Sequence, residues 1–244
     1  MSLGTTLATA ARVLRQVRRD RRTVALVIVV PPALLALFKY VFEGQPQTFE
    51  RIGPTLVGIF PLVIMFLLTS IAMLRERTTG TLERLMSMPL AKLDLLLGYG
   101  LAFAVVAAVQ ACVTALVGFG LLGLDTAGPV WLVLVLAVAN AVLGMALGLF
   151  LSAFARTEFQ AVQFMPAFIL PQLFLGGLFV PRDEMARALE VVSVFMPMTY
   201  AYDALARATA DDLGARLAFD AVVLAGCIVL SLVLGATTLR RRTA

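Results

Sequence analysis

The sequence predicts an all-α integral membrane protein with six transmembrane helices. Its 244 residues are 61% hydrophobic and 14% charged, and its mean hydropathy is +0.95. Soluble domains average about 45–50% apolar and about 25% charged residues. Six apolar runs approach or exceed the roughly 20 residues that a helix needs to cross the hydrocarbon. Helices are expected in these runs because an open strand could not satisfy its backbone groups in lipid.

Residues 1–22 are predicted to form an amphipathic helix in the membrane interface. Its apolar stripe repeats every three or four residues, at Leu3, Leu7, Ala10, Leu14 and Val17. Four arginines occupy the flank and the far side, namely Arg12, Arg15, Arg19 and Arg22. A basic face opposite a leucine stripe is typical of helices that lie on a membrane.

Residues 23–244 are predicted to form one six-span domain, with spans at residues 23–42, 54–74, 95–122, 130–154, 161–180 and 217–239. An even number of spans puts both termini on one side. With the termini, the loop after the second span and the turn at residues 156–158 placed inside, that side carries 14 of the 20 lysines and arginines. The positive-inside rule therefore predicts a multi-pass protein of the inner or plasma membrane with both termini in the cytoplasm.

Several features within the spans predict local behaviour. Pro61 in the second span, and Pro166 with Pro171 in the fifth, are expected to interrupt or kink their helices. Small residues in the fourth span share one face and favour close helix packing, at Ala141, Gly144, Gly148 and Ser152. Four amides lie within spans and serve either helix-to-helix hydrogen bonds or a substrate path, namely Gln110, Asn140, Gln163 and Gln172. Three charged residues near span ends are expected to snorkel, namely Lys39, Asp94 and Asp220.

Residues 182–215 are predicted to lie on the outer side. An apolar stripe indicates a helix of about 12 residues, too short to span, formed around Met185, Leu189, Val192 and Phe195. An external or re-entrant amphipathic helix fits this pattern. Residues 199–216 are then expected to run polar along the outer surface.

The loop at residues 75–92 is predicted to contain a second amphipathic helix. A turn signal at residues 78–81 precedes a short helical run, Leu82 to Met88, which Pro89 ends. Leu82, Leu85 and Met86 share one face of that run, while Glu83 and Arg84 point elsewhere.

The missing residue types exclude several kinds of chemistry. The chain has no histidine, which removes histidine-dependent hydrolysis and histidine-ligated zinc. Cys112 and Cys227 lie within apolar runs and are expected to act as small hydrophobic residues, so no metal site is predicted. The chain has no phosphate-binding loop, so ATP would have to bind to another polypeptide. Its basic residues form no separate domain that would favour nucleic-acid binding.

Two stretches resemble one known family. The pattern E-R-x-x-G-T-L-E-R-L-x-x-x-P, at residues 76–89, resembles the first cytoplasmic loop of ABC-2 type permeases, the membrane subunits of certain ABC exporters. Residues 181–207 end in M-P-M-T-Y-A-Y-D-A-L-A-R and are similar to the N-P-L-T-Y-x-x-x-x-x-R region before that family's last span. Met196 stands where the family usually has Asn. The resemblance covers essentially the whole chain and implies a type V ABC exporter-like fold with a cytoplasmic coupling helix and short external helices.

The resemblance also implies a function and partners. The chain would be the permease subunit of an ATP-driven exporter, in which two copies pair with two ATPase subunits that bind ATP and Mg. It would contact membrane lipid and move a hydrophobic drug-like or lipid-like compound out of the cytoplasm. The residues implied to couple to the ATPase are Glu76, Arg77, Gly80, Thr81, Leu82, Glu83, Arg84, Leu85, Met86 and Pro89. The N-terminal helix would anchor the chain in the membrane, flank the ATPase contact, or do both.

In this family the second and fifth spans line the path between two permease copies. The resemblance therefore implies a translocation path along Phe60, Met65, Phe66, Thr69, Phe164, Phe168, Gln172 and Phe174. It places an external gate at Pro181, Pro197 and Tyr200.

Other functions remain open at this point. The chain could be an ATP-independent secondary transporter or channel, although such proteins commonly show inverted repeats or mid-membrane charge. It could also export glycan precursors within the same family. An intramembrane aspartyl protease is disfavoured because Asp203 lies outside the spans and no G-x-G-D partner exists. A scaffold role leaves the loop pattern unexplained.

Overall fold

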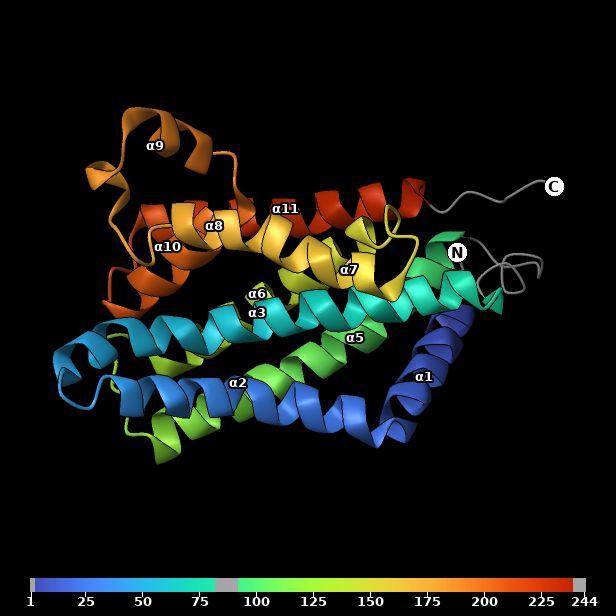
Figure 1. The fold of residues 1–244 in the computed structure, drawn as a ribbon, viewed down its shortest axis with the longest axis horizontal. Helices are drawn as coiled ribbons and strands as arrows, with labels where there is room; N and C mark the ends of the chain where they lie inside the picture. The colour runs from blue at the N-terminus through green and yellow to red at the C-terminus, as the bar shows by residue number, and fades with distance from the viewer. Residues whose placement is uncertain (1–2, 82–91, 239–244) are drawn as a thin grey trace.

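The computed structural model describes residues 3–81 and 92–238, and these form a bundle of helices (Figure 1). Its main helices run along the long axis, and they are α2 (Arg21–Val41), α3 (Pro46–Thr78), α5 (Lys92–Ala115), α6 (Val130–Leu151) and α11 (Ala215–Thr237). A π-helical turn, η1 (Leu116–Leu121), extends α5. With that extension, five helices of the described chain are long and apolar enough to cross a bilayer.

The fifth predicted span is a composite helix. It consists of α7 (Glu158–Phe164), the π-helical η2 (Met165–Ile169) and α8 (Leu170–Leu175). Pro166 lies in the wide π turn and Pro171 begins the last segment, so the helix changes its winding at the prolines but continues. It ends five residues before the expected boundary. Because neither α7 nor α8 is long enough alone to count as a span, the sixth crossing stays a prediction.

In contrast, α3 is one uninterrupted helix of 33 residues through Pro54 and Pro61. The expectation that Pro61 interrupts this helix was wrong. A proline removes one backbone hydrogen bond, and most residues around Pro61 are buried in the centre of the bundle. Close packing on neighbouring helices offsets that single loss.

The small residues of α6 allow this packing. A Cβ atom added to Gly144 would lie 2.0 Å from the Leu62 carbonyl oxygen, and one at Gly148 would lie 2.2 Å from the Thr69 hydroxyl. That hydroxyl lies 2.8 Å from the Met65 carbonyl oxygen and 3.2 Å from the Met145 carbonyl oxygen. The predicted small-residue face is therefore the surface on which α6 packs against α3.

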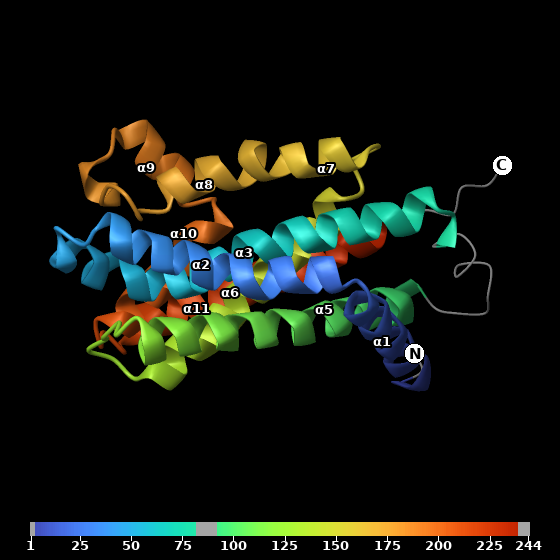
Figure 2. The ribbon, with the colours of Figure 1, turned by 60° about the horizontal axis from the view of Figure 1, so that its bottom comes forward.

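At one end of the bundle, α1 (Leu3–Arg19) crosses the other helices (Figures 1 and 2). It packs on α5 at Gly98, where an added Cβ would lie 2.5 Å from Thr9. The helix ends three residues before the expected Arg22 because Asp20 instead caps α2, its side chain accepting a hydrogen bond of 3.1 Å from the Thr23 amide. The amphipathic pattern is present, but Ala10 and Val13 are its buried residues, whereas Leu3 and Leu7 are 82% and 56% exposed.

The opposite end holds η3 (Arg182–Glu184), α9 (Arg187–Ser193) and α10 (Pro197–Thr209) (Figure 2). The short outer helix was expected to have about 12 residues, but α9 has seven. The expected polar run over residues 199–216 was also wrong. Helix α10 buries one face against α6 and α11, formed by Met198, Ala201, Ala204, Leu205 and Ala208. These residues recur at helical spacing, and the polar residues between them concealed the pattern.

Candidate functional site

The loop pattern that resembles the ABC-2 permeases begins in the last turn of α3. Glu76 and Arg77 lie in that turn, and Thr79 is the C-cap. Gly80 has a φ of 71°, in the left-handed region that glycine adopts readily just after a helix. Thr81 closes this described part of the chain. The remaining coupling residues lie outside the described residues and stay a prediction, namely Leu82, Glu83, Arg84, Leu85, Met86 and Pro89.

Glu76 is turned into the protein, with its side chain only 5% exposed. Its Oε1 atom lies 3.6 Å from Nη1 of Arg12 in α1. Nη2 of Arg12 donates a hydrogen bond to the hydroxyl of Tyr99 in α5, and the guanidinium carbon lies 5.4 Å from the centre of the Tyr99 ring. These three residues, here called the Arg12 cluster, join α1, α3 and α5 beside the loop.

The Arg12 cluster is only partly satisfied. Oε2 of Glu76 and Nε of Arg12 are buried and have no hydrogen-bond partner among the described residues. Buried charges are costly unless they are paired, and their attraction depends on distance and on the local dielectric. A displacement of the end of α3 relative to α1 would therefore change the energy of this cluster.

A second ion pair joins α3 to α7 at the surface. Arg75 Nε lies 2.6 Å from Oε1 of Glu158, and Arg75 Nη2 lies 3.1 Å from Oε2. The hydrogen bond from Arg75 lowers the pKa of the Glu158 carboxyl. Both side chains are slightly more than half exposed, so the pair positions α7 but contributes little stability.

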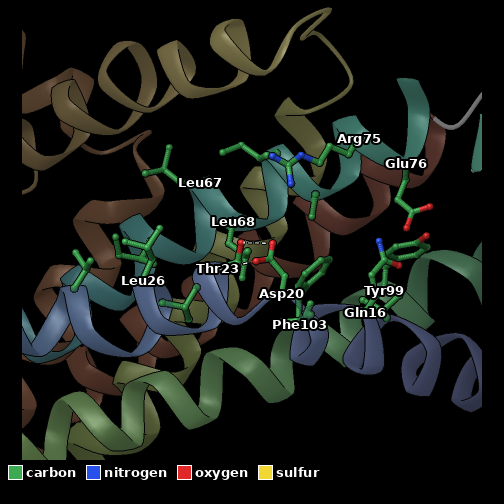
Figure 3. Close-up of a pocket in the computed structure, with 17 residues that line it drawn as sticks. Gln16, Asp20, Thr23, Leu26, Leu67, Leu68, Arg75, Glu76, Tyr99 and Phe103 are labelled. Carbon is green, nitrogen blue, oxygen red and sulfur yellow. Dashed lines mark hydrogen bonds between the residues drawn. The ribbon is translucent and has the colours of Figure 1, made fainter. Parts of the chain in front are cut away.

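A groove of about 450 Å³ lies beside the Arg12 cluster, between α1, α2, α3 and α5 (Figure 3). Asp20, Arg75 and Glu76 form its polar end. Its walls are otherwise mostly apolar and extend along α2 as far as Val30 and along α3 as far as Ile64. This α1–α3 groove was not expected from the sequence.

The path residues predicted on α3 are largely buried within this single chain. Met65, Phe66 and Thr69 are fully buried, and the Thr69 hydroxyl bonds to backbone carbonyl oxygens as described above. Phe60 is partly buried, and its ring meets that of Phe38 edge-on, with centroids 5.7 Å apart.

The path residues predicted on the composite helix differ in exposure. Phe164 and Phe168 are partly buried against the core, whereas Phe174 is 58% exposed. Gln172 is buried; its Nε2 donates to the Phe168 carbonyl at 3.0 Å and its Oε1 accepts from the Met198 amide at 3.4 Å. This amide therefore links α8 to α10.

The predicted gate residues lie at the end opposite α1. Pro181 precedes η3 and is exposed, and Pro197 begins α10. The Tyr200 hydroxyl donates to the Val194 carbonyl at 2.8 Å, and its ring lies 6.2 Å from that of Phe219. The structure therefore brings Tyr200 against α11 and leaves Pro181 apart in the preceding turn.

A largely buried carboxyl lies near these residues, and its burial was not expected from the sequence. Asp203 accepts a hydrogen bond from Arg182 and its side chain is 14% exposed. Burial raises the pKa of Asp203 to about 6, although the positive charge of Arg182 opposes that rise. Among the described residues, no group of three or more His, Cys, Asp or Glu side chains could hold a metal ion.

The amides within the helices take different roles. Asn140 donates to the Ala201 carbonyl at 3.2 Å, so it joins α6 to α10. Gln163 is exposed. Gln110 is fully buried, and neither its Nε2 nor its Oε1 has a partner in the part of the chain that the structure describes.

Each of the three charged residues expected to snorkel has a partner inside the protein. Lys39 donates to the Leu122 carbonyl, beyond η1, at 2.7 Å. Asp94 is buried and accepts from the Thr5 hydroxyl at 3.2 Å. Asp220 accepts from Arg207 at 3.0 Å.

Comparison with known proteins gives a consistent result. The family model described as ABC-2 type transporter matches residues 5–208. The chain is 26% identical over 163 residues to the probable multidrug ABC transporter permease YbhS of Escherichia coli (strain K12), covering 66% of this chain and 43% of the relative. It is 25% identical over 150 residues to YbhR of the same strain, covering 62% and 41%. With ABC transporter G family member 20 of Dictyostelium discoideum it shares 25% identity over 164 residues, covering 66% and 22%. The matched part spans less than half of each of these relatives.

Proposed function

Since the chain belongs to the ABC-2 type transporter family, we propose that it is a permease subunit through which a separate ATPase drives export of a hydrophobic drug-like or lipid-like compound. The chain is a multi-pass membrane subunit of a transporter. Two of its relatives carry the name of probable multidrug ABC transporter permeases, which supports a drug-like substrate. The ATPase would bind ATP and Mg, and two copies of each subunit would form the exporter.

The observation that carries the coupling proposal is the burial of Glu76 in the Arg12 cluster. Glu76 lies at the start of the loop that would dock on the ATPase, yet its carboxylate contacts α1 rather than solvent. Closure of the ATPase dimer would push the loop and, with it, the last turn of α3. Through Arg12 and Tyr99, that movement would reach α1 and α5, so that nucleotide binding biases the opening of a path between two permease copies.

The arrangement of the chain supports a cytoplasmic position for this end of the bundle. The first residues of α1, the last turns of α3 and α11 and the start of α5 lie together there (Figure 1). Most lysines and arginines among the described residues fall in segments at or next to this end, as the positive-inside rule requires of the cytoplasmic side. Both termini would then be cytoplasmic, and the composite helix would complete the sixth crossing.

The hydrogen bonds of three polar side chains within the helices support a hydrophobic substrate. The Thr69 hydroxyl, the Asn140 Nδ2 and the Gln172 amide bond to other parts of the same chain, so these donors and acceptors are not free to bind a polar solute. The remaining side chains of the proposed path are mainly aromatic, namely Phe60, Phe66, Phe164, Phe168 and Phe174. Aromatic surfaces suit an apolar or amphiphilic compound.

A charge placed on the predicted docking face tests the coupling. In vesicles reconstituted with the ATPase, Leu85→Asp is expected to abolish substrate-stimulated ATP hydrolysis and transport. A carboxylate cannot fill an apolar docking groove on the ATPase without a large desolvation cost. Ser87→Asp adds the same charge at a position off the leucine face and should retain most activity. Wild-type hydrolysis and transport in Leu85→Asp would reject the coupling role of this loop.

A further inference from the structure

The α1–α3 groove has the polarity and length of one membrane leaflet. Asp20, Arg75 and Glu76 form its polar end, and its apolar wall continues along α3 to Ile64. From Arg75 to Ile64 is about 16 Å at the helical rise of 1.5 Å per residue, close to the roughly 15 Å of hydrocarbon in a single leaflet. Leu26 lines the groove and is 62% exposed, so the groove is accessible from the side of the bundle.

At Asp20, the polar end of the groove adjoins a basic corner between α1 and α2. Arg18, Arg19, Arg21 and Arg22 surround Asp20 in the sequence and are exposed. Within residues 3–81 and 92–238, none of these four arginines forms an ion pair. Asp20 is already engaged by the Thr23 amide and hydroxyl, at 3.1 Å and 2.6 Å. The corner therefore carries a net positive charge with free guanidinium donors.

We propose that the α1–α3 groove binds an anionic phospholipid, with one acyl chain between α2 and α3 and its phosphate against the arginines of the α1–α2 corner. Guanidinium groups bind phosphate through short, charge-assisted hydrogen bonds. Arginines beside a membrane helix attract anionic headgroups in particular. The site requires only that the chain lies in a bilayer, so it is independent of the proposed pairing with an ATPase.

Charge complementarity decides between this occupant and two others. A cationic amphiphile would meet the four exposed arginines next to the groove. The two carboxylates that line the groove are already engaged, Asp20 by Thr23 and Glu76 by Arg12. A second copy of the chain would bring the same basic corner towards itself. An anionic phospholipid satisfies both the charge and the apolar walls with one molecule.

Native mass spectrometry of the purified chain in mild detergent tests the site. Phosphatidylglycerol and phosphatidylcholine with identical acyl chains would be titrated separately, and the bound lipid and oligomeric state read from the same spectra. Phosphatidylglycerol is expected to bind at least tenfold more tightly than phosphatidylcholine. Arg21→Gln with Arg22→Gln should weaken that binding about 30-fold, at roughly fivefold per arginine. Arg156→Gln with Arg216→Gln removes two exposed arginines outside the corner and should leave binding unchanged.

Filling the groove separates a built site from a basic patch. Ala72 and Val30 line the groove, and Ala72→Phe or, in a separate variant, Val30→Phe should reduce phosphatidylglycerol binding at least tenfold. Val109→Phe enlarges an exposed residue of α5 outside the groove and serves as the control. Gel filtration and circular dichroism would identify any variant that misfolds.

Three results would overturn the proposal. The first is equal binding of the two lipids, and the second is a loss of binding that follows only the arginines and not the groove. The third is a change of oligomeric state in Ala72→Phe and Val30→Phe without a change in lipid binding, which would assign the groove to a second copy.

Discussion

Glu76 lies between a loop predicted to dock on an ATPase and the ends of three helices. Its carboxylate is buried and meets Arg12 across 64 positions of sequence, while Tyr99 holds the other side of the Arg12 guanidinium. A buried ion pair is weak evidence for stability in itself, but removing one partner leaves an uncompensated charge. A substitution of Glu76 therefore tests whether the Arg12 cluster connects the loop to α1 and α5.

Glu76→Gln is expected to lower the free energy of unfolding by about 2 kcal/mol. It preserves shape but leaves Arg12 partly buried beside Tyr99 without its counter-charge. Glu158→Gln removes the partner of Arg75 in an exposed pair and should cost less than about 1 kcal/mol. Denaturation of the purified variants in detergent measures both values. Equal losses of unfolding free energy would show that the Arg12–Glu76 pair contributes no more to stability than the exposed Arg75–Glu158 pair.

The raised pKa of Asp203, at the end of the bundle opposite α1, predicts that the stability of the fold depends on pH. Burial raises its pKa from 3.8 to about 6, so the folded chain binds a proton more readily than the unfolded chain does. This contribution to stability is complete below about pH 3.8 and is lost as pH rises through about 6. Arg182, Arg207 and Asp220 are the charges that act on this carboxyl.

Comparing the pH dependence of the melting temperature in two variants isolates the contribution of Asp203 to stability. Asp203→Asn should remove part of the increase in melting temperature that wild type shows between about pH 6 and pH 4, whereas Asp212→Asn, at a more exposed carboxylate paired with Arg207, should not. Identical pH profiles for wild type and Asp203→Asn would contradict the raised pKa.

The sequence identified the types of site residue better than their partners. It placed Glu76 in the loop pattern because that pattern is local. It assigned Arg12 to the polar flank of α1 because helical periodicity gives a face but not the residue opposite it. Asp203 was judged only as a possible catalytic acid, since its burial depends on α10 packing against α6 and α11. Contacts between helices are set by tertiary packing, which a single sequence does not encode locally.

Among contacts between elements, α3 and α6 pack closely enough for a single added methyl group to test the contact. Gly144→Ala should destabilise the bundle by about 1–3 kcal/mol, because its Cβ would overlap the Leu62 carbonyl. Gly226→Ala in α11 meets nothing within 4 Å and should be neutral or slightly stabilising. Thermal unfolding of the two variants compares them directly. A Gly144→Ala variant as stable as Gly226→Ala would show that α3 and α6 do not pack this closely.

The prolines show why element boundaries were harder to predict than element positions. Pro61 lies in a continuous helix, whereas Pro166 coincides with a π-helical turn. The same residue type gives two results because α3 is buried on most sides, while the composite helix is exposed along much of its length. Six apolar runs predicted six spans; five of them lie in long helices, and the fifth run along the chain is a helix of changing winding.

At the scale of the whole molecule, the two ends of the bundle have different characters. One end gathers the Arg12 cluster, the α1–α3 groove and the ends of α3 and α5 that flank the loop. The other carries α9, α10 and the Asp203–Arg182 pair (Figure 2). In the proposed exporter, the ATPase would act at the first end and the compound would leave at the second.

The most direct test is to co-purify the chain with its candidate ATPase in mild detergent and to measure the mass of the complex. We expect two copies of each subunit, and we expect Leu85→Asp to separate the ATPase while the permease stays folded in the membrane fraction. A chain that binds no ATPase and moves solute by itself would rule out the proposed exporter and would identify an ATP-independent transporter.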